Sequence, residues 1–403
     1  MRIIHTADWH LCDRLGKIDR TRDLEARVEA VAALCLEHRA DVLLIAGDVF
    51  SEQATVDEMT RSLEHVVKTF APFCARGGTI LAITGNHDRD GKVNMVRAGM
   101  KLAAPDAGRD GVLPAGRMYL VNGRAVASLV GAGGQRVQFV LVPYPFSSRY
   151  DLSATEYRSK EEENRLLHGR VAEWIQRASA DPKFDPALPT ILTAHLHVRG
   201  SEVHAVYKMS ERDDVLFDLG DLNPMWTYVA LGHIHKPQIL GGAENVRYPG
   251  SLDRLDFGDT HDEHGVLLLE IDGARPVAPT RLRIPGTPFH TIELADPASE
   301  LDSLAEKYPD RETAIVRFRL GACGAGSSRD EVGRKLRKLF PRCHDMKWLE
   351  AEADGDAPTV GFTVRAGFET TVREYLGEKL IGDADRDRVL ELAETFLTEL
   401  RNR

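Results

Sequence analysis

Short apolar runs and amphipathic stretches alternate along the first two-thirds of the chain. The runs at residues 42–45 and 80–83 contain only aliphatic residues, which is typical of strands buried on both faces. Between the early runs, apolar positions recur at helical spacing, namely Leu24, Val28, Val31 and Cys35, followed by Met59, Leu63, Val66, Val67 and Phe70. This alternation predicts βαβ units and a largely parallel sheet.

The pattern continues with shorter strand-like segments after residue 100. Strands are expected at 117–121, 125–130 and 136–142, and a helix at 160–179. Beyond residue 235 the chain is again rich in strands, which suits the second sheet of a sandwich. We therefore expect an α/β fold in which two sheets are flanked by helices.

A Pro/Gly break at residues 283–288 marks the expected end of this first domain. The segment after it alternates like a half-buried strand at 314–320 and then carries a basic helix at 329–342. Two more helical stripes follow near the end of the chain. The expected domains are thus 1–285, 286–365 and 366–403.

Metal-capable residues follow the predicted strands in clusters. They are Asp8-Trp9-His10, Gly47-Asp48, Gly85-Asn86-His87-Asp88, His195 and Gly232-His233-Ile234-His235. Each cluster alone could be an ordinary turn or helix cap. Their joint occurrence predicts one site, because side chains that repeatedly follow strands converge at one edge of a sheet. Carboxylates and imidazoles suit divalent metals, and a close metal pair suits phosphoryl chemistry.

Some residues near these clusters have two interpretations. In an extended segment His195 and His197 face the same side, so either could be a ligand. We favour His195, which directly follows the strand, and expect His197 to be solvated. We expect Cys12 to be a small buried thiol and Trp9 to pack on the sheet.

Composition limits the class of protein. The chain has 403 residues, a net charge of −10 and five scattered cysteines without a C-x-x-C motif, which argues against a disulfide framework and a structural zinc site. An acidic chain is no obvious DNA binder, so nucleic acid would have to be contacted by local patches, metals or a partner. No apolar stretch is long enough to span a bilayer, and without a signal-peptide pattern we expect a cytoplasmic protein.

Four segments carry a resemblance to a known family: residues 46–50, 85–89, 231–238 and 246–251. Together they resemble the calcineurin-like metallophosphoesterase superfamily and, within it, the SbcD-like nuclease subunits of SbcCD complexes. The resemblance implies a nuclease that hydrolyses phosphodiester bonds at DNA ends or hairpins in double-strand-break repair. It also implies a capping domain and an SMC-type SbcC-like ATPase as partner.

The resemblance assigns roles to the clusters. Asp8, His10 and His235 would hold one metal, Asn86, His195 and His233 the other, and Asp48 both. In that family the ions are usually Mn²⁺, and Mg²⁺ or another divalent ion is possible. His87 would protonate the leaving oxygen, and Asp88 would orient His87. Archaeal members often carry a His where this chain has Ser51, so a second histidine at the phosphate is not expected.

The resemblance also implies interaction surfaces. The stripes at 59–70 and 95–102 could form a homodimer interface, and the C-terminal helices could dock on the ATPase. Apart from the resemblance, the excess of basic residues in helix 329–342 makes it the best candidate for a surface that faces DNA. Two alternatives stay open: a phosphodiesterase for small substrates such as cyclic nucleotides, and a scaffold that binds DNA ends without cleaving them. The segment after residue 285 argues against the first, and the complete ligand set argues against the second.

Overall fold

The computed structural model describes residues 1–101, 103–108, 110–203, 214–222, 226–275, 277–323, 328–349 and 386–401. The chain divides into two compact units, Met1–Glu350 and Ala351–Arg403.

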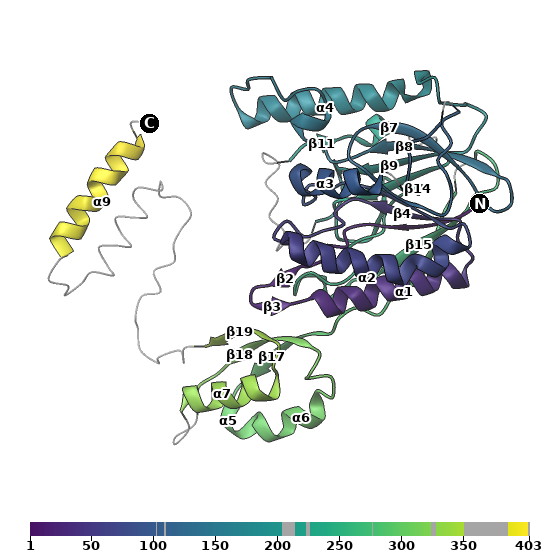
Figure 1. The fold of residues 1–403 in the computed structure, drawn as a ribbon. Helices are drawn as coiled ribbons and strands as arrows, with labels where there is room; N and C mark the ends of the chain where they lie inside the picture. The colour runs from purple at the N-terminus through teal and green to yellow at the C-terminus, as the bar shows by residue number, and fades with distance from the viewer. Residues whose placement is uncertain are drawn as a thin grey trace. The chain divides into compact units, whose positions relative to one another are not determined.

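Two six-stranded sheets form the centre of the first unit (Figure 1). The first sheet has the order β16-β15-β1-β4-β5-β6. Its strands are β1 (Arg2–Thr6), β4 (Val42–Ala46), β5 (Thr79–Ile83), β6 (Met118–Val121), β15 (Gly265–Glu270) and β16 (Thr280–Arg283). Within this sheet β1, β4, β5 and β6 run parallel, whereas β15 pairs antiparallel with both β1 and β16.

The second sheet has the order β13-β14-β12-β9-β8-β7. Its strands are β7 (Ala125–Val130), β8 (Arg136–Val142), β9 (Thr190–His195), β12 (Tyr228–Gly232), β13 (Gln238–Leu240) and β14 (Ala243–Tyr248). The four inner strands are parallel, and both edge strands are antiparallel. The predicted α/β sandwich is thus confirmed, with parallel strands that bring their carboxyl ends to a common edge.

Helices cover the outer faces of both sheets (Figure 1). They are α1 (Thr21–Glu37), α2 (Val56–Ala75), α3 (Asp90–Met100) and α4 (Lys160–Arg177). Successive strand residues point to opposite sides, so Ile3 packs between the sheets and Ile4 packs under the helices. The apolar stripe of α1 is buried as predicted, but Val67 of α2 is 65% exposed, contrary to the predicted stripe, because it lies off the buried face.

Short elements complete the sandwich. They are β2 (Arg14–Leu15), β3 (Ile18–Asp19), β10 (His197–Val198), β11 (Leu216–Phe217), η1 (Ser147–Arg149), η2 (Ala178–Ala180), η3 (Leu219–Leu222) and η4 (Asp259–His261). The strand β10 pairs in parallel with β11, which brings the segment after Asp214 beside the end of β9.

A small three-stranded parallel sheet follows the sandwich. Its elements are β17 (Phe289–Leu294), α5 (Pro297–Glu300), η5 (Leu301–Ser303), α6 (Leu304–Lys307), β18 (Ile315–Leu320), α7 (Arg329–Leu339) and β19 (Cys343–Trp348). The helix α7 ends at Leu339, earlier than predicted, because Phe340-Pro341 cannot continue it.

The small sheet is tied to the sandwich by buried polar contacts. Asp253 accepts hydrogen bonds from Arg20 at 3.1 Å and from the backbone N–H of Thr287 at 2.7 Å, and both Arg20 and Asp253 have 0% exposure. Arg342 forms a two-pronged ion pair with Asp23 of α1. The predicted domain boundaries at 285 and 365 stay predictions, and the latter lies outside the described residues.

The described part of the second unit is the helix α9 (Arg386–Arg401). Its apolar residues Leu392 and Phe396 are 58% and 57% exposed. The other predicted C-terminal helix, around residues 368–376, lies outside the described residues. Among the helices that the structure describes, none is both long and apolar enough to cross a bilayer.

Candidate metal centre

The loops after β1, β4 and β12 interlock at one edge of the sandwich. The backbone N–H of Asp8 donates to the carbonyl of Gly47 at 3.1 Å, and that of His10 donates to the carbonyl of Asp48 at 3.0 Å. The N–H of His233 donates to the Asp8 carboxylate at 3.1 Å. These contacts bring side chains from both sheets into one place.

Several of these residues adopt a left-handed backbone conformation that side chains rarely take. The φ angles are 52° for Asp8, 46° for His10, 50° for Asp48 and 98° for His233. Such geometry persists only where surrounding structure enforces it, and it is concentrated at functional sites. Here it turns each side chain inward, since all four residues are at most 5% exposed.

One group of candidate ligands comprises Asp8, His10 and His235, whose ligand atoms lie within 4.8 Å of one another. The Nε2 atoms of His10 and His235 face each other at 3.2 Å. The carboxylate of Asp48 lies 3.8 Å from His10 Nε2 on the side of the second group.

The second group gathers around Asn86 Oδ1, which lies 3.0 Å from both His195 Nε2 and His233 Nδ1. The other ring nitrogen of His195 donates to the Ala46 carbonyl at 2.7 Å. Asp48 Oδ2 lies 3.3 Å from His195 Nε2. All seven predicted ligands therefore lie in one connected cluster, and the ion that each would hold stays a prediction.

Acceptors that converge in this way require positive charge between them. Burial alone would raise the pKa of Asp48, but His195 and two further histidines hold that pKa well below its usual range. Burial opposes charge on His195 too, yet Asp48 and Asp8 raise its pKa to about 9, so a proton supplies the charge when no metal does. Carboxylate, amide and imidazole ligands thus fit divalent cations, and binding would release that proton.

Other members of the cluster have pKa values set mainly by burial. Burial lowers the pKa of His10 to about 3 and that of His235 well below its usual value, so both are neutral imidazoles, the form that binds metals. Burial, together with the neighbouring Asp48, raises the pKa of Asp8 to about 8. A cation beside Asp8 would reverse that shift, because it favours the carboxylate.

His87 lies at the open side of the cluster. Its Nε2 is 3.9 Å from Asp48 Oδ2, and its side chain is 24% exposed. Its Nδ1 faces Glu52 at 3.8 Å. A buried edge toward the ligands and an exposed edge toward solvent would let His87 contact a phosphate held at the cluster.

Asp88 makes contacts different from those expected. Its carboxylate accepts hydrogen bonds from the backbone N–H groups of Val49, Phe50 and Gly85 at 2.8–3.1 Å. It therefore joins the loop of Asp48 to the loop of Asn86. The role of orienting His87 stays a prediction for Asp88, and Glu52 is the carboxylate that the structure gives beside that ring.

The structure adds residues that the sequence did not single out. The buried guanidinium of Arg149 donates to the carbonyls of Gly85 and Asp88 at 3.2 and 2.9 Å, which holds the Asn86 loop. Asp214 lies 2.7 Å from His233 Nε2. The expectation that His197 is solvated is wrong, because this residue is 9% exposed and its ring contacts the Asp214 carboxylate. The His-x-His spacing of residues 195–197 was the one sign in the sequence that pointed to this contact.

Two smaller expectations are confirmed. Trp9 is fully buried and stacks on Phe70, with its indole N–H bonded to Thr6. Cys12 is 4% exposed, and its sulfur lies 3.1 Å from the Ser62 hydroxyl.

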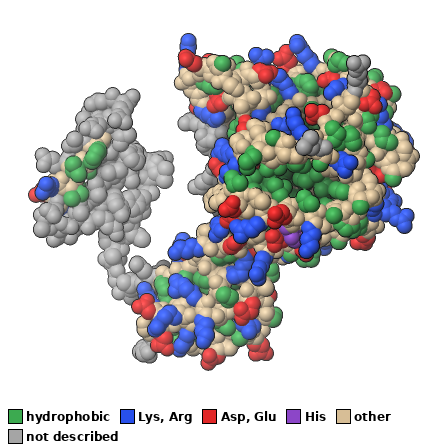
Figure 2. Space-filling view, viewed as in Figure 1, with side chains coloured by type: hydrophobic (Ala, Val, Ile, Leu, Met, Phe, Trp, Pro, Cys, Tyr) green, Lys and Arg blue, Asp and Glu red, His purple; other side chains and the backbone are tan. Residues whose placement is uncertain are grey.

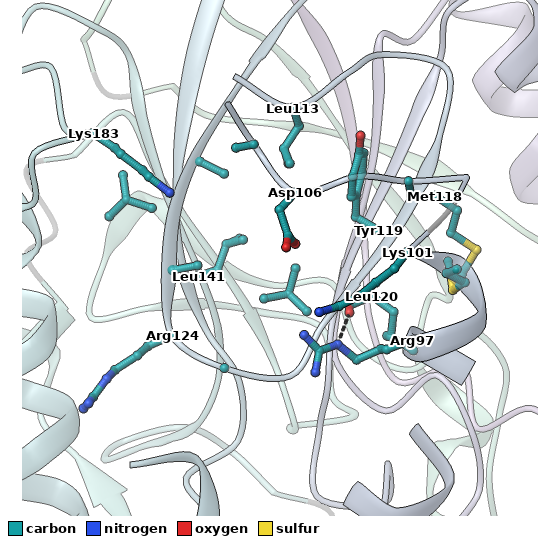
Figure 3. Close-up of a pocket in the computed structure, with 18 residues that line it drawn as sticks. Arg97, Lys101, Asp106, Leu113, Met118, Tyr119, Leu120, Arg124, Leu141 and Lys183 are labelled. Atoms are coloured by element: carbon teal, nitrogen blue, oxygen red, sulfur yellow. Dashed lines mark hydrogen bonds between the residues drawn. The ribbon is translucent and has the colours of Figure 1, made fainter. Parts of the chain in front are cut away.

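A separate cavity of about 390 Å³ opens between the end of α3 and the strands β6 and β7 (Figure 3). Aliphatic side chains such as Leu141 form its floor, while Arg97, Lys101, Arg124 and Lys183 surround it. Figure 2 shows a hydrophobic area on one face of the first unit, with basic and acidic side chains around it. None of the predicted site residues lines this cavity, so it is distinct from the metal centre.

Comparison with known proteins gives consistent matches. The model of the family described as calcineurin-like phosphoesterase matches residues 1–237. A Rhodobacter capsulatus protein, named as a subunit of the nuclease SbcCD, is 30% identical over 340 residues, covering 79% of this chain and 79% of that protein. An Escherichia coli K12 protein of the same name is 28% identical over 309 residues, covering 74% and 72%. An Aeropyrum pernix protein named DNA double-strand break repair protein Mre11 is 25% identical over 298 residues, covering 73% and 63%.

Proposed function

Because the chain belongs to the calcineurin-like phosphoesterase family, we propose that it is a metal-dependent DNA nuclease that hydrolyses phosphodiester bonds at DNA ends or hairpins in double-strand-break repair. The observation that carries this proposal is the convergence of carboxylate, amide and imidazole acceptors at one edge of the sandwich. Relatives named as nuclease subunits match over most of the chain, beyond the part that the family model covers.

The proposed metal shell follows the two groups of ligands. One ion is assigned to Asp8, His10 and His235, the other to Asn86, His195 and His233, and Asp48 is assigned to both. We take the ions to be two Mn²⁺, with Mg²⁺ as the alternative. When bound, such a pair neutralises phosphate charge and activates water. Asp88 and Arg149 hold the loops that present Asp48 and Asn86.

His87 is the proposed general acid, since it lies beside Asp48 and reaches solvent. It would hold the proton that the leaving oxygen takes. Glu52 faces its Nδ1 and also pairs with Arg89, whose side chain is 51% exposed. We therefore assign the exposed Arg89 a contact with the phosphate backbone of DNA.

We further propose an SbcC-like SMC-type ATPase as the partner, because two relatives are named as subunits of SbcCD. The exposed Leu392 and Phe396 of α9 would form part of the surface that binds it. A homodimer would use the exposed Val67 and Met95 of α2 and α3. The proposed location is the cytoplasm.

The experiment compares wild-type protein with His87→Ala on linear duplex, single-stranded and hairpin-ended DNA. Each substrate is incubated with Mn²⁺, Mg²⁺ or EDTA, and bis(p-nitrophenyl) phosphate is the small ester. We expect Mn²⁺-dependent cleavage of DNA that His87→Ala loses while still binding metal. If DNA stays intact, the mixtures are repeated with the SbcC-like partner and ATP. Cleavage of the small ester alone under all these conditions would contradict the nuclease assignment.

A further inference from the structure

Four polar groups converge on the carboxylate of Asp214, which lies in none of the motifs. Its Oδ2 is 2.7 Å from His233 Nε2 and 3.1 Å from His197 Nδ1. Its Oδ1 accepts from the Tyr144 hydroxyl at 3.0 Å and from the backbone N–H of Val215 at 2.8 Å. The side chain of Asp214 is 4% exposed, so water does not replace these partners.

This arrangement decides which nitrogen of His233 carries hydrogen. An ionised carboxylate acts only as an acceptor, so His233, whose Nε2 lies 2.7 Å from Asp214 Oδ2, must present Nε2–H to it. A neutral imidazole has a single N–H, which leaves a lone pair on Nδ1. That Nδ1 lies 3.0 Å from Asn86 Oδ1, which is also an acceptor. Two acceptors at this distance repel each other unless a cation lies beside them.

The ring of Tyr144 supports the same side chains. Its centroid lies 5.6 Å from the ring of His233 and 6.1 Å from that of His195. Tyr144 thus packs on two candidate ligands while its hydroxyl holds Asp214. His197 contacts the carboxylate from the other side, 6.0 Å from the His233 ring between centroids.

We propose that Asp214, held by Tyr144 and His197, is a positioning residue that fixes His233 in the tautomer whose Nδ1 binds the second divalent ion. The inference rests on the proposed function, because it takes His233 as a ligand. A carboxylate that accepts the other N–H of a ligating histidine fixes the ring and increases its basicity. Losing such a partner typically lowers metal affinity by about 10–100-fold.

The chain offers a matched control for each test variant. Asp221→Asn controls for Asp214→Asn, because Asp221 Oδ2 also accepts from a histidine, at 3.0 Å from His168 Nε2, away from the candidate ligands. Tyr228→Phe controls for Tyr144→Phe, since the buried Tyr228 hydroxyl bonds His5 at 3.0 Å. In each pair, the test variant removes a hydrogen-bonding group beside the metal centre, and the control removes the same type of group beside a histidine that is not a candidate ligand.

The first measurement uses calorimetry to determine how tightly Mn²⁺ binds to metal-free protein. We expect wild-type protein and both controls to bind two ions, and Asp214→Asn to bind one of them about 10–100-fold more weakly. Tyr144→Phe should weaken the same ion less, because Asp214 keeps its other donors. Unchanged affinity in Asp214→Asn would overturn the inference. If that variant fails to fold, unchanged affinity in Tyr144→Phe would overturn it.

The second measurement is the long-range ¹H–¹⁵N spectrum of histidine rings in metal-free protein, with His233 assigned by comparison with His233→Asn. We expect the Nε2–H tautomer in wild type and its loss in Asp214→Asn. The Nδ1–H tautomer in wild type would overturn the inference. If His233→Asn still binds two ions with wild-type affinity, the proposed ligand set fails. If that variant loses an ion and Asp214→Asn does not, only the present inference fails.

Discussion

Replacing Gly85 with Ala tests how closely the loops of the metal centre approach each other. A Cβ at residue 85 would lie 2.1 Å from Asp48 Oδ1 and 2.5 Å from the backbone nitrogen of Asp48. Ordinary contacts of carbon are about 3.5 Å, so the overlap exceeds about 1 Å. A change of side-chain rotamer cannot relieve it, because one of the clashing atoms belongs to the backbone.

The loops have little freedom to move apart. Asp88 bonds the N–H groups of Val49, Phe50 and Gly85, and Asp48 Oδ1 accepts from the N–H of His87 at 2.8 Å. Inserting a methyl group into such a place costs about 1–3 kcal/mol. Distances between a metal and its ligands in a well-formed site lie within about 0.2 Å of standard values. Moving Asp48 should therefore weaken Mn²⁺ binding at least about tenfold, which equals about 1.4 kcal/mol.

The assay measures thermal unfolding and Mn²⁺ affinity for Gly85→Ala beside Gly91→Ala. Gly91 lies in α3, and a Cβ there would meet no atom within 4 Å. Ala at that position should leave stability unchanged or raise it by up to about 1 kcal/mol, without affecting the metal. If the two variants had the same melting temperature and the same affinity for Mn²⁺, the close packing of the two loops described here would be contradicted.

Three further outcomes are expected. For each bound ion, Mn²⁺ at about 100 times the Kd of its site should stabilise the protein by about 2.7 kcal/mol in thermal unfolding, and EDTA should reverse the effect. An unchanged melting temperature would contradict a metal site. Arg149→Lys should lower the free energy of unfolding in urea by about 1–3 kcal/mol, because an ammonium cannot satisfy the carbonyls that the guanidinium holds, and wild-type stability would show that they find water instead. Arg20→Met should lower the free energy of unfolding by about 3–5 kcal/mol in the same assay, since it leaves the buried Asp253 without its ion-pair partner. A loss under about 1 kcal/mol would mean that the backbone N–H groups of Thr287 and Arg254 suffice for that carboxylate.

The sequence predicted the sandwich and the cluster well because both depend on local patterns. Aliphatic runs define buried strands, and the polar residues directly after them must meet at the sheet edge. His10, Asp48 and His195 come together in the structure for this reason. The buried face of α1 was predicted equally well from its apolar residues, because each of them is buried in the structure.

Other parts depend on contacts that no local pattern encodes. Asp214 approaches His233 from a different loop, and the acidic surroundings of Asp214 in the sequence look like an ordinary turn. Arg149 reaches the Asn86 loop through backbone carbonyls, which every residue possesses. Asp88 was matched to His87 by proximity in sequence, whereas its carboxylate turns to backbone N–H groups of another loop. Hydrogen bonds of this kind become visible only once the chain is folded.

The left-handed residues of the metal centre imply a conflict between stability and activity. Glycine would adopt the φ angles of Asp8, His10, Asp48 and His233 freely, whereas each side chain there costs about 1–3 kcal/mol. A chain selected for thermal robustness alone would lose these side chains early. Their presence means that this edge of the sandwich is kept for its chemistry, and efforts to make the protein more heat-resistant should start elsewhere in the fold.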